Sequence, residues 1–86
     1  MQKVYVLTSF EIDTGEHLET QVFSDLRSLG AWFAGFVEGY GIDPEELESQ
    51  MDDQLPFLSG PEASISLVLG DFEFVVDLVP LQGARG

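Results

Sequence analysis

The segment 24–41, SDLRSLGAWFAGFVEGYG, carries the clearest pattern in the chain. Its apolar side chains recur every three or four residues, which predicts an α-helix with one buried side. The set comprises Leu26, Leu29, Phe33, Phe36, Val37 and Tyr40, with Trp32 at its flank. Three internal glycines each weaken such a helix by about 1 kcal/mol relative to alanine, so packing must hold it. We expect this side to face the core of its own domain rather than a dimer seam.

The ends of this helix are marked by residues with capping preferences. Ser24 is the predicted N-cap, and Asp25 in the first turn suits the positive end of the helix dipole. Gly41 predicts the C-terminal stop, because glycine adopts the left-handed conformation at little cost.

A second helix is expected directly afterwards. Asp43 can cap its first turn, and Pro44 suits the first helical position. Its buried side is narrow, with Leu47 and Met51, and the rest of it is acidic.

The segment before the first helix predicts a β-hairpin. Residues 3–12 and 17–23 alternate between two faces, and residues 13–15 form a three-residue loop with Gly15 in the left-handed conformation. This loop length sets the pairs Phe10–Leu18, Thr8–Thr20 and Val6–Val22. We expect the apolar members of these pairs to face the helices.

The segment after the helices predicts a second hairpin. Residues 64–69 and 72–78 alternate, Gly70 and Asp71 suit a two-residue loop, and Pro80 ends the last strand. Four apolar side chains are expected to face the helices: Ile65, Leu67, Phe72 and Phe74.

This order predicts an α+β domain of two layers, ββααββ, in which two hairpins form one four-stranded antiparallel sheet with both helices on one face. Residues 1–80 form the single domain and residues 81–86 a flexible C-terminal tail. The other face of the sheet would then carry four carboxylates mixed with apolar side chains. These are Glu11, Glu19, Glu73 and Asp77, with Tyr5, Leu7, Phe23 and Val75.

Composition excludes several classes of protein. The 86 residues include 16 Asp and Glu, 3 Lys and Arg and no Cys, for a net charge of -13. Without Cys there is no disulfide framework, thiolate metal site or thiol nucleophile. A hydrophobic content of 44% with 12% aromatic residues argues for a folded chain. The longest apolar run falls short of the ~20 residues that span a bilayer, and an anionic leaflet would repel this charge.

Three features invite a catalytic or metal-binding interpretation, and each has an ordinary alternative. Asp13-Thr14-Gly15 matches the aspartic-protease tripeptide but is also what a hairpin loop demands. His17 is the sole imidazole and suits an exposed cross-strand pair with Glu11. The carboxylates do not follow the calcium-loop pattern. We therefore expect no enzyme activity, no catalytic residue, no metal and no cofactor.

The distribution of acids is the feature that ordinary solubility does not require. Residues 28–84 contain eleven carboxylates and no Lys or Arg, whereas soluble domains intersperse both signs. The six carboxylates of residues 43–53 would occupy ~16 Å of helix, one per ~2.7 Å, against one phosphate per ~1.7 Å of duplex DNA. A groove built to neutralise phosphates would meet this segment as a competing polyanion.

In size, charge and lack of catalytic motifs the chain resembles the small acidic nucleic-acid mimics of phages and mobile elements, including anti-restriction and anti-CRISPR proteins. The resemblance covers the profile of the whole chain and transfers no residue. It implies a DNA-mimic inhibitor in the cytoplasm of a bacterial host, acting as an anti-CRISPR protein that blocks DNA or PAM recognition by an effector complex. A restriction-type nuclease is another partner that it implies.

The sequence thus predicts a monomer or homodimer that binds a basic nucleic-acid-binding protein, and neither nucleic acid itself nor a membrane. The predicted contact residues are Asp43, Glu45, Glu46, Glu48, Asp52 and Asp53, followed by Glu73, Asp77, Glu11 and Glu19. The alternative is a structural or adaptor protein whose acidity serves only solvation, with an apolar interface on the sheet or beside Trp32.

Overall fold

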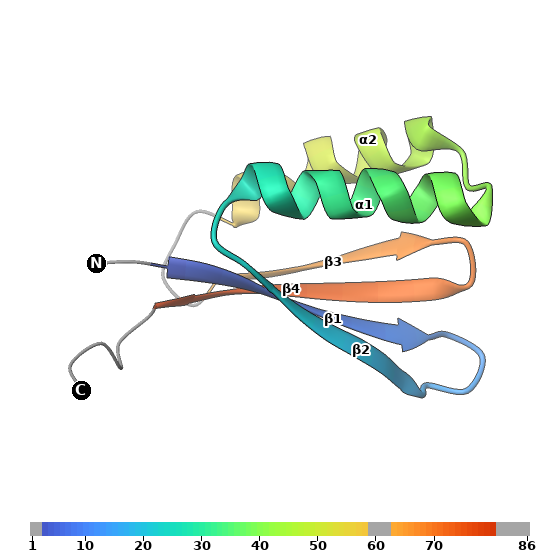
Figure 1. Cartoon of the computed structure of the whole chain (residues 1–86), viewed down its shortest axis with the longest axis horizontal. Coiled ribbons are helices and arrows are strands. Elements are labelled where there is room, and N and C mark those ends of the chain that lie inside the picture. Colours follow the sequence, from blue (N-terminus) through green and yellow to red (C-terminus); the bar gives the residue numbers. More distant parts are fainter. Residues whose placement is uncertain (1–2, 59–62, 81–86) are drawn as a thin grey trace.

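The computed structural model describes residues 3–58 and 63–80. In chain order the elements are β1 (Lys3–Glu11), β2 (His17–Phe23), α1 (Leu26–Tyr40), α2 (Pro44–Gln54), the short 3-10 helix η1 (Leu55–Phe57), β3 (Ser64–Leu69) and β4 (Phe72–Pro80). The strands form one antiparallel sheet in the order β2-β1-β4-β3 (Figure 1). The predicted α+β class, element order and four-stranded sheet are confirmed. The predicted tail, residues 81–86, lies outside the described residues.

The core lies between α1 and the central strands. Figure 1 shows α1 and α2 running alongside each other on one side of the sheet. The fully buried side chains come from α1 and from three strands. They are Leu29 and Phe33 of α1, Leu7 of β1, Leu67 and Leu69 of β3, and Phe74 and Val76 of β4. Burying a side chain of this size contributes about 1.5–3 kcal/mol, which offsets the three glycines of α1.

Aromatic rings make the contact between α1 and β4. The ring of Phe33 lies 5.2 Å from that of Phe74 in an edge-to-face arrangement, and Phe36 lies 4.9 Å from the same ring. Trp32 packs against Phe74 at 5.9 Å. The middle of the apolar side of this helix therefore faces its own domain, as its spacing predicts. At the two ends of the predicted set, Leu26 and Tyr40 are exposed instead.

The β1–β2 hairpin reaches the predicted register by a different route. The amide of Glu11 donates to the carbonyl of Glu16 at 2.9 Å. This pairing leaves residues 12–15 in the loop, one residue more than predicted. Phe10 consequently pairs with His17, and the predicted pairs Phe10–Leu18 and Glu11–His17 are wrong. A bulge at Leu18 shifts the register back. Beyond the bulge, Thr8–Thr20 and Val6–Val22 are paired as predicted, and Gly15 has the predicted positive φ of 71°.

The predicted faces of β1 and β2 are reversed in the structure. Leu7 is fully buried on the helix side, whereas Val22 is 61% exposed on the other side. The cause is the pairing of β1 with β4, which places Leu7 beside Val76 and Val6 beside Asp77. Neighbouring residues of a sheet share a face, so β4 dictates the orientation of β1 and, through it, of β2.

The β3–β4 hairpin follows its prediction. Leu69 pairs with Phe72 across the two-residue loop, and Ile65, Leu67 and Phe74 are buried. Gly70 has φ 62°. A Cβ there would lie 3.4 Å from the Ile42 side chain, so this hairpin packs against the α1–α2 connection.

The N-cap of α1 is Asp25 and not Ser24. The Asp25 carboxylate accepts a hydrogen bond from the backbone amide of Ser28 at 2.7 Å. This bond, more than the nearby charge of Arg27, lowers the pKa of Asp25 below its ordinary value of 3.8. Gly41 ends the helix in the left-handed conformation with φ 68°, as predicted.

Asp25→Ala is expected to lower the melting temperature at pH 7 by several degrees, because an amide at the helix start loses its acceptor. Since the folded state lowers the pKa of Asp25, its stabilisation is present above pH 3.8 and is lost as the pH falls through the folded value. The deficit should therefore shrink in acid. Asp25→Asn keeps the acceptor and should melt close to the wild type at pH 7. Equal melting of the wild type and Asp25→Ala at pH 7 would contradict this cap.

Candidate acidic interface

Helix α2 is anchored to the domain by a narrow side. Asp43 caps it through a hydrogen bond from the Glu45 amide at 3.0 Å, and Pro44 occupies its first turn, as predicted. Leu47 and Met51 are half-buried against the core. No residue of α2 is fully buried, so most of its circumference faces solvent.

A side-chain amide fastens α2 to the sheet. The Gln50 side chain donates to the carbonyl of Val68 on β3 and accepts from the amide of the same residue at 2.6 Å. β3 is an edge strand, and its outward backbone groups would otherwise face water. Gln50 therefore positions α2 and covers part of this edge.

Gln50→Ala is expected to destabilise the fold by about 1–3 kcal/mol, the net worth of two such hydrogen bonds. Native-state hydrogen exchange should show earlier exchange at the Val68 amide than in the wild type, with exchange at Phe74 following only the global loss of stability. Gln50→Glu tests the geometry further, because a carboxylate cannot donate to the Val68 carbonyl. An unchanged Val68 exchange rate in both variants would contradict the contact.

The carboxylates of α2 form two rows. Glu45, Glu48 and Asp52 follow the spacing i, i+3 and i+7, which places them along one side of a helix. Glu46 and Asp53, seven residues apart, form a second row beside it. The six residues predicted for the first contact surface, these five and Asp43, are all exposed.

Three connections of the chain meet at the end of the molecule where α2 begins. The amide of Ile12, in the β1–β2 loop, donates to the carbonyl of Asp71, in the β3–β4 loop, at 3.0 Å. Ile42, between the helices, packs against Gly70 of that same loop. The loops of both hairpins and the helix–helix connection are therefore neighbours, and each brings carboxylates.

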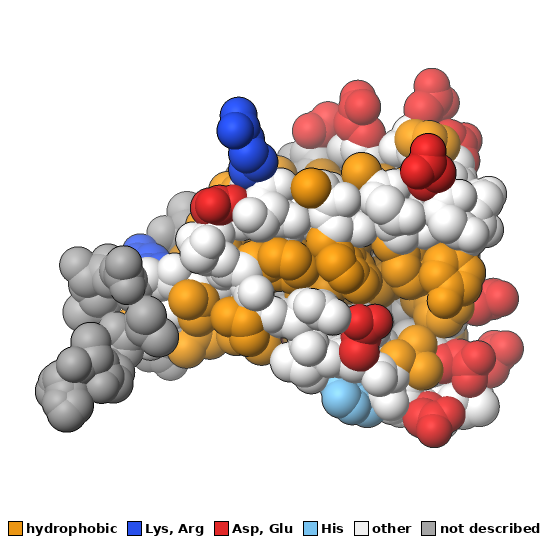
Figure 2. All heavy atoms as spheres, in the orientation of Figure 1, with side chains coloured by type: hydrophobic (Ala, Val, Ile, Leu, Met, Phe, Trp, Pro, Cys, Tyr) orange, Lys and Arg blue, Asp and Glu red, His pale blue; other side chains and the backbone are white. Residues whose placement is uncertain are grey.

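We call the carboxylates of this end and of α2 the acidic face. They number eleven of the fifteen carboxylates among the described residues, and Glu62 is the one that lies outside them. The members are Glu11, Asp13, Glu16, Glu38, Asp43, Glu45, Glu46, Glu48, Asp52, Asp53 and Asp71. Figure 2 shows most of the acidic side chains over α2 and around this end.

The cations of the described residues lie toward the other end. Lys3 begins β1 and Arg27 is in the first turn of α1, and both elements run from there toward the acidic end. Figure 2 shows the blue side chains on that side of the molecule. The charge is thus polarised along the molecule and not spread evenly over it.

The predicted acidic sheet face is wrong in its membership. Glu73 and Asp77 do lie on the face turned away from the helices, beside Phe10 and Val6. Glu19 pairs with the buried Ser9 and is on the helix side. Glu11 pairs with Phe72, whose ring contacts α1, so it is on the helix side too. Tyr5 and Phe23, predicted on the open face, also pack against the core.

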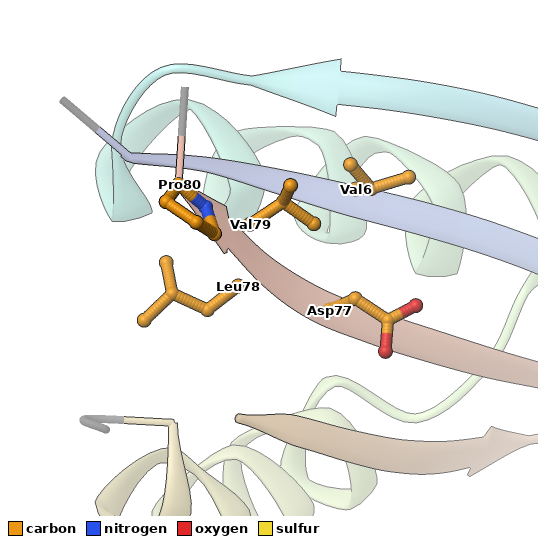
Figure 3. A pocket seen from close by; sticks show the side chains of 5 residues that line it. All are labelled: Val6, Asp77, Leu78, Val79 and Pro80. Atoms are coloured by element: carbon orange, nitrogen blue, oxygen red, sulfur yellow. The ribbon is translucent and has the colours of Figure 1, made fainter. Parts of the chain in front are cut away.

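Apolar side chains, most of them valines, share the open face with Glu73 and Asp77. Its apolar side chains are Val4, Val6, Phe10, Val22, Val68, Val75 and Val79. An open pocket of about 510 Å³ lies at one end of this face, lined by Val6, Asp77, Leu78, Val79 and Pro80 (Figure 3). The alternation of β1 carries apolar residues on both faces, so the sequence alone did not reveal which set is uncovered.

The motifs with a possible catalytic interpretation lie on the surface. Residues 13–15 lie in the exposed β1–β2 loop, where the Thr14 hydroxyl donates to the Glu11 carboxylate at 2.9 Å. His17 is exposed, shares a hydrogen bond of 2.9 Å with the Thr20 hydroxyl and contacts the ring of Phe10. Within residues 3–58 and 63–80, no three His, Asp or Glu side chains are grouped so that they could hold a metal ion.

Comparisons of the chain with protein-family models, with curated proteins and with solved structures give no match. Among the described residues, neither helix has the length and apolar character needed to cross a membrane.

Two carboxylates of α2 oppose the helix dipole. Asp52 and Asp53 lie in its last turn, where the dipole is negative and where this helix has no basic residue. Glu45 and Glu46 lie in the first turn, where the dipole favours them. Glu45–Glu48 and Glu48–Asp52 add like-charge repulsion of about 0.2–0.5 kcal/mol per pair.

Asp52→Asn and Asp53→Asn are therefore expected to stabilise the fold at low ionic strength, each by about 0.3–1 kcal/mol. The rise in melting temperature would be about 4–8 °C per kcal/mol for a domain of this size. Glu45→Gln and Glu46→Gln are matched controls at the other end of the helix and should be destabilising or neutral. The gain should fade in high salt. A loss of stability in both Asp variants at low salt would mean that neither carboxylate is held against the dipole at a cost.

Proposed function

We propose that the protein is a non-catalytic nucleic-acid mimic, which presents its acidic face to the basic nucleic-acid-binding cleft of a partner protein and so excludes the nucleic acid. The observation that carries the proposal is the gathering of eleven carboxylates over α2 and the adjoining end, away from Lys3 and Arg27. A cleft that binds phosphates through Lys and Arg gains its affinity by releasing counterions. Binding of the acidic face would release counterions in the same way and so give the cleft a similar gain in affinity.

Energetics supports this proposal over acidity that serves only solvation. A solvating surface works with both signs of charge interspersed. Here α2 tolerates repulsion along one row and places Asp52 and Asp53 against its own dipole. Such an arrangement costs stability, and a cationic partner would convert the cost into binding free energy.

The partner is a protein or complex that reads nucleic acid, and the protein acts on it stoichiometrically. The resemblance to small acidic mimics makes a CRISPR effector complex the first candidate and a restriction-type nuclease the second. Both candidate partners would act in the cytoplasm of a bacterial host. Long-range attraction should make association fast and strongly dependent on ionic strength.

Two variants of equal net charge test the proposal. Glu45→Gln/Glu48→Gln/Asp52→Asn neutralises the outer row of α2 and changes the net charge from -13 to -10. Ser24→Lys/Ala31→Lys/Ala34→Lys reaches the same net charge at exposed positions of α1 and the residue before its cap, on the side that carries Arg27. The measurement is the affinity for a CRISPR effector complex from about 50 to 200 mM salt.

The first variant should weaken binding at least about ten-fold and flatten the dependence of affinity on salt, because about three counterion-releasing contacts are lost. The second should bind within about three-fold of the wild type, since it leaves the acidic face intact. Equal losses in both variants would show that net charge and not the acidic face governs binding. An affinity that does not change with salt would also refute the mimicry.

A second candidate function is favoured by the valine-rich open face of the sheet. An antiparallel sheet with one covered face usually turns polar side chains to water on the other. An adaptor that binds an apolar surface through this face would explain Val22, Val68 and Val79, which are all more than a third exposed. This adaptor function predicts that the affinity for the apolar partner does not depend on salt and that Val22→Lys abolishes binding.

A further inference from the structure

A row of three aromatic side chains on α1 ends beside the acidic face. Trp32, Phe36 and Tyr40 follow one another at intervals of four residues along α1. The rings of Trp32 and Phe36 are stacked at 5.4 Å with an angle of 22°, and those of Phe36 and Tyr40 are 4.5 Å apart at 30°. We call these three rings the aromatic ladder. Figure 2 shows hydrophobic side chains following α1 on the side toward the sheet.

The ladder is only partly covered by the fold. Trp32 and Phe36 are half-buried against the core, and Tyr40 is 61% exposed. From β2, Phe23 covers the Trp32 end of the ladder, with its ring 6.4 Å from that of Trp32. The open ring surface of the ladder is therefore greatest at Tyr40, at the end nearest the acidic face.

Two carboxylates border the ladder from the sheet. Glu11 pairs with Phe72, whose ring lies 5.2 Å from that of Tyr40. Glu19 is on the same side of the sheet, as its pairing with Ser9 shows. Each is held by a neighbour, since the Thr14 hydroxyl donates to Glu11 at 2.9 Å and the Gln21 amide donates to Glu19 at 2.7 Å. Open rings and fixed carboxylates thus lie next to each other.

The chemistry that satisfies both groups at once is the guanidinium of arginine. It stacks on aromatic rings through its planar face and donates hydrogen bonds to a carboxylate through its edge. The ammonium of lysine is a compact, strongly hydrated charge and stacks less well on aromatic rings. No cation of the described residues occupies this place, because Lys3 and Arg27 begin their elements at the other end.

We propose that the aromatic ladder with Glu11 and Glu19 is an arginine-binding surface, and that arginine side chains of the basic partner stack there. The inference rests on the proposed function and adds to it the contact that charge pairs alone lack, since binding energy concentrates on aromatic and arginine anchors that are shielded from water. The acidic face attracts the partner over a distance, and the ladder selects arginine at contact.

The test compares nona-arginine with nona-lysine, two peptides of equal charge and length, at about 150 mM salt. Affinity is measured by calorimetry and by the emission of Trp32, the only tryptophan in the chain. We expect nona-arginine to bind the wild type at least about five-fold more tightly than nona-lysine and to change the Trp32 emission more. Circular dichroism of each variant checks that it is folded.

The variants separate the ladder from other exposed groups. Tyr40→Ala, and Tyr40→Leu as the version that keeps apolar cover, should reduce the arginine preference to less than about two-fold. Phe57→Ala is the matched control, because Phe57 is 70% exposed elsewhere and should leave the preference intact. Glu11→Gln/Glu19→Gln should also reduce the preference, whereas Glu48→Gln/Asp52→Asn removes the same charge from α2 and should weaken both peptides equally.

The outcomes distinguish this inference from the function on which it rests. Equal affinity of the wild type for both peptides, or an arginine preference that survives Tyr40→Leu, would overturn the ladder and leave the acidic face standing if Glu48→Gln/Asp52→Asn still weakens both. Failure of both peptides to bind the wild type would overturn the inference and also remove the electrostatic basis of the proposed function.

Discussion

The acidic helix stays on the domain through a narrow apolar side and two hydrogen bonds made by one glutamine. Helix α2 contributes no fully buried side chain, and its carboxylates repel one another and the other acids of the chain. Against this, Leu47 and Met51 supply a narrow apolar contact and Gln50 supplies two hydrogen bonds to Val68. A rigid acidic surface requires this attachment, because a detached acidic helix would be a flexible chain of charge.

Contacts between the loops explain where the other carboxylates gather. The hairpin loops and the helix–helix connection meet at one end, joined by the bond from Ile12 to Asp71 and by the packing of Ile42 on Gly70. Their acids lie at the end of the molecule where α2 begins. The aromatic ladder runs along α1 to the same end, since Tyr40 is the last residue of that helix. A partner that bound the acidic face as proposed would therefore meet the exposed ring of Tyr40 beside it.

Local sequence patterns predicted most of the fold. The apolar period of α1, the left-handed Gly41, the cap at Asp43 and the two-residue loop at Gly70 are all set by a few neighbouring residues, and the structure confirms them. The acids of α2 could be predicted as exposed for the same reason, because the helix has only one narrow apolar side.

What the sequence did not disclose depends on contacts between distant segments. Strand β1 is apolar on both faces, and only its pairing with β4 decides that Leu7 is buried and Val6 is not. That pairing moved Glu11 and Glu19 to the helix side, where they border the ladder, and left valines on the open face. The tie between Gln50 and Val68 joins residues eighteen positions apart, and no local pattern marks it.

The most direct test of the central claim is a competition between this protein and duplex DNA for one partner. A CRISPR effector complex is saturated with labelled target DNA, and the fraction of DNA that remains bound is followed as the protein is added. Mimicry predicts that one protein displaces the DNA from each site. It also predicts that the protein concentration needed for half-displacement rises in proportion to the DNA concentration. A ternary complex that retains both the DNA and the protein would contradict it.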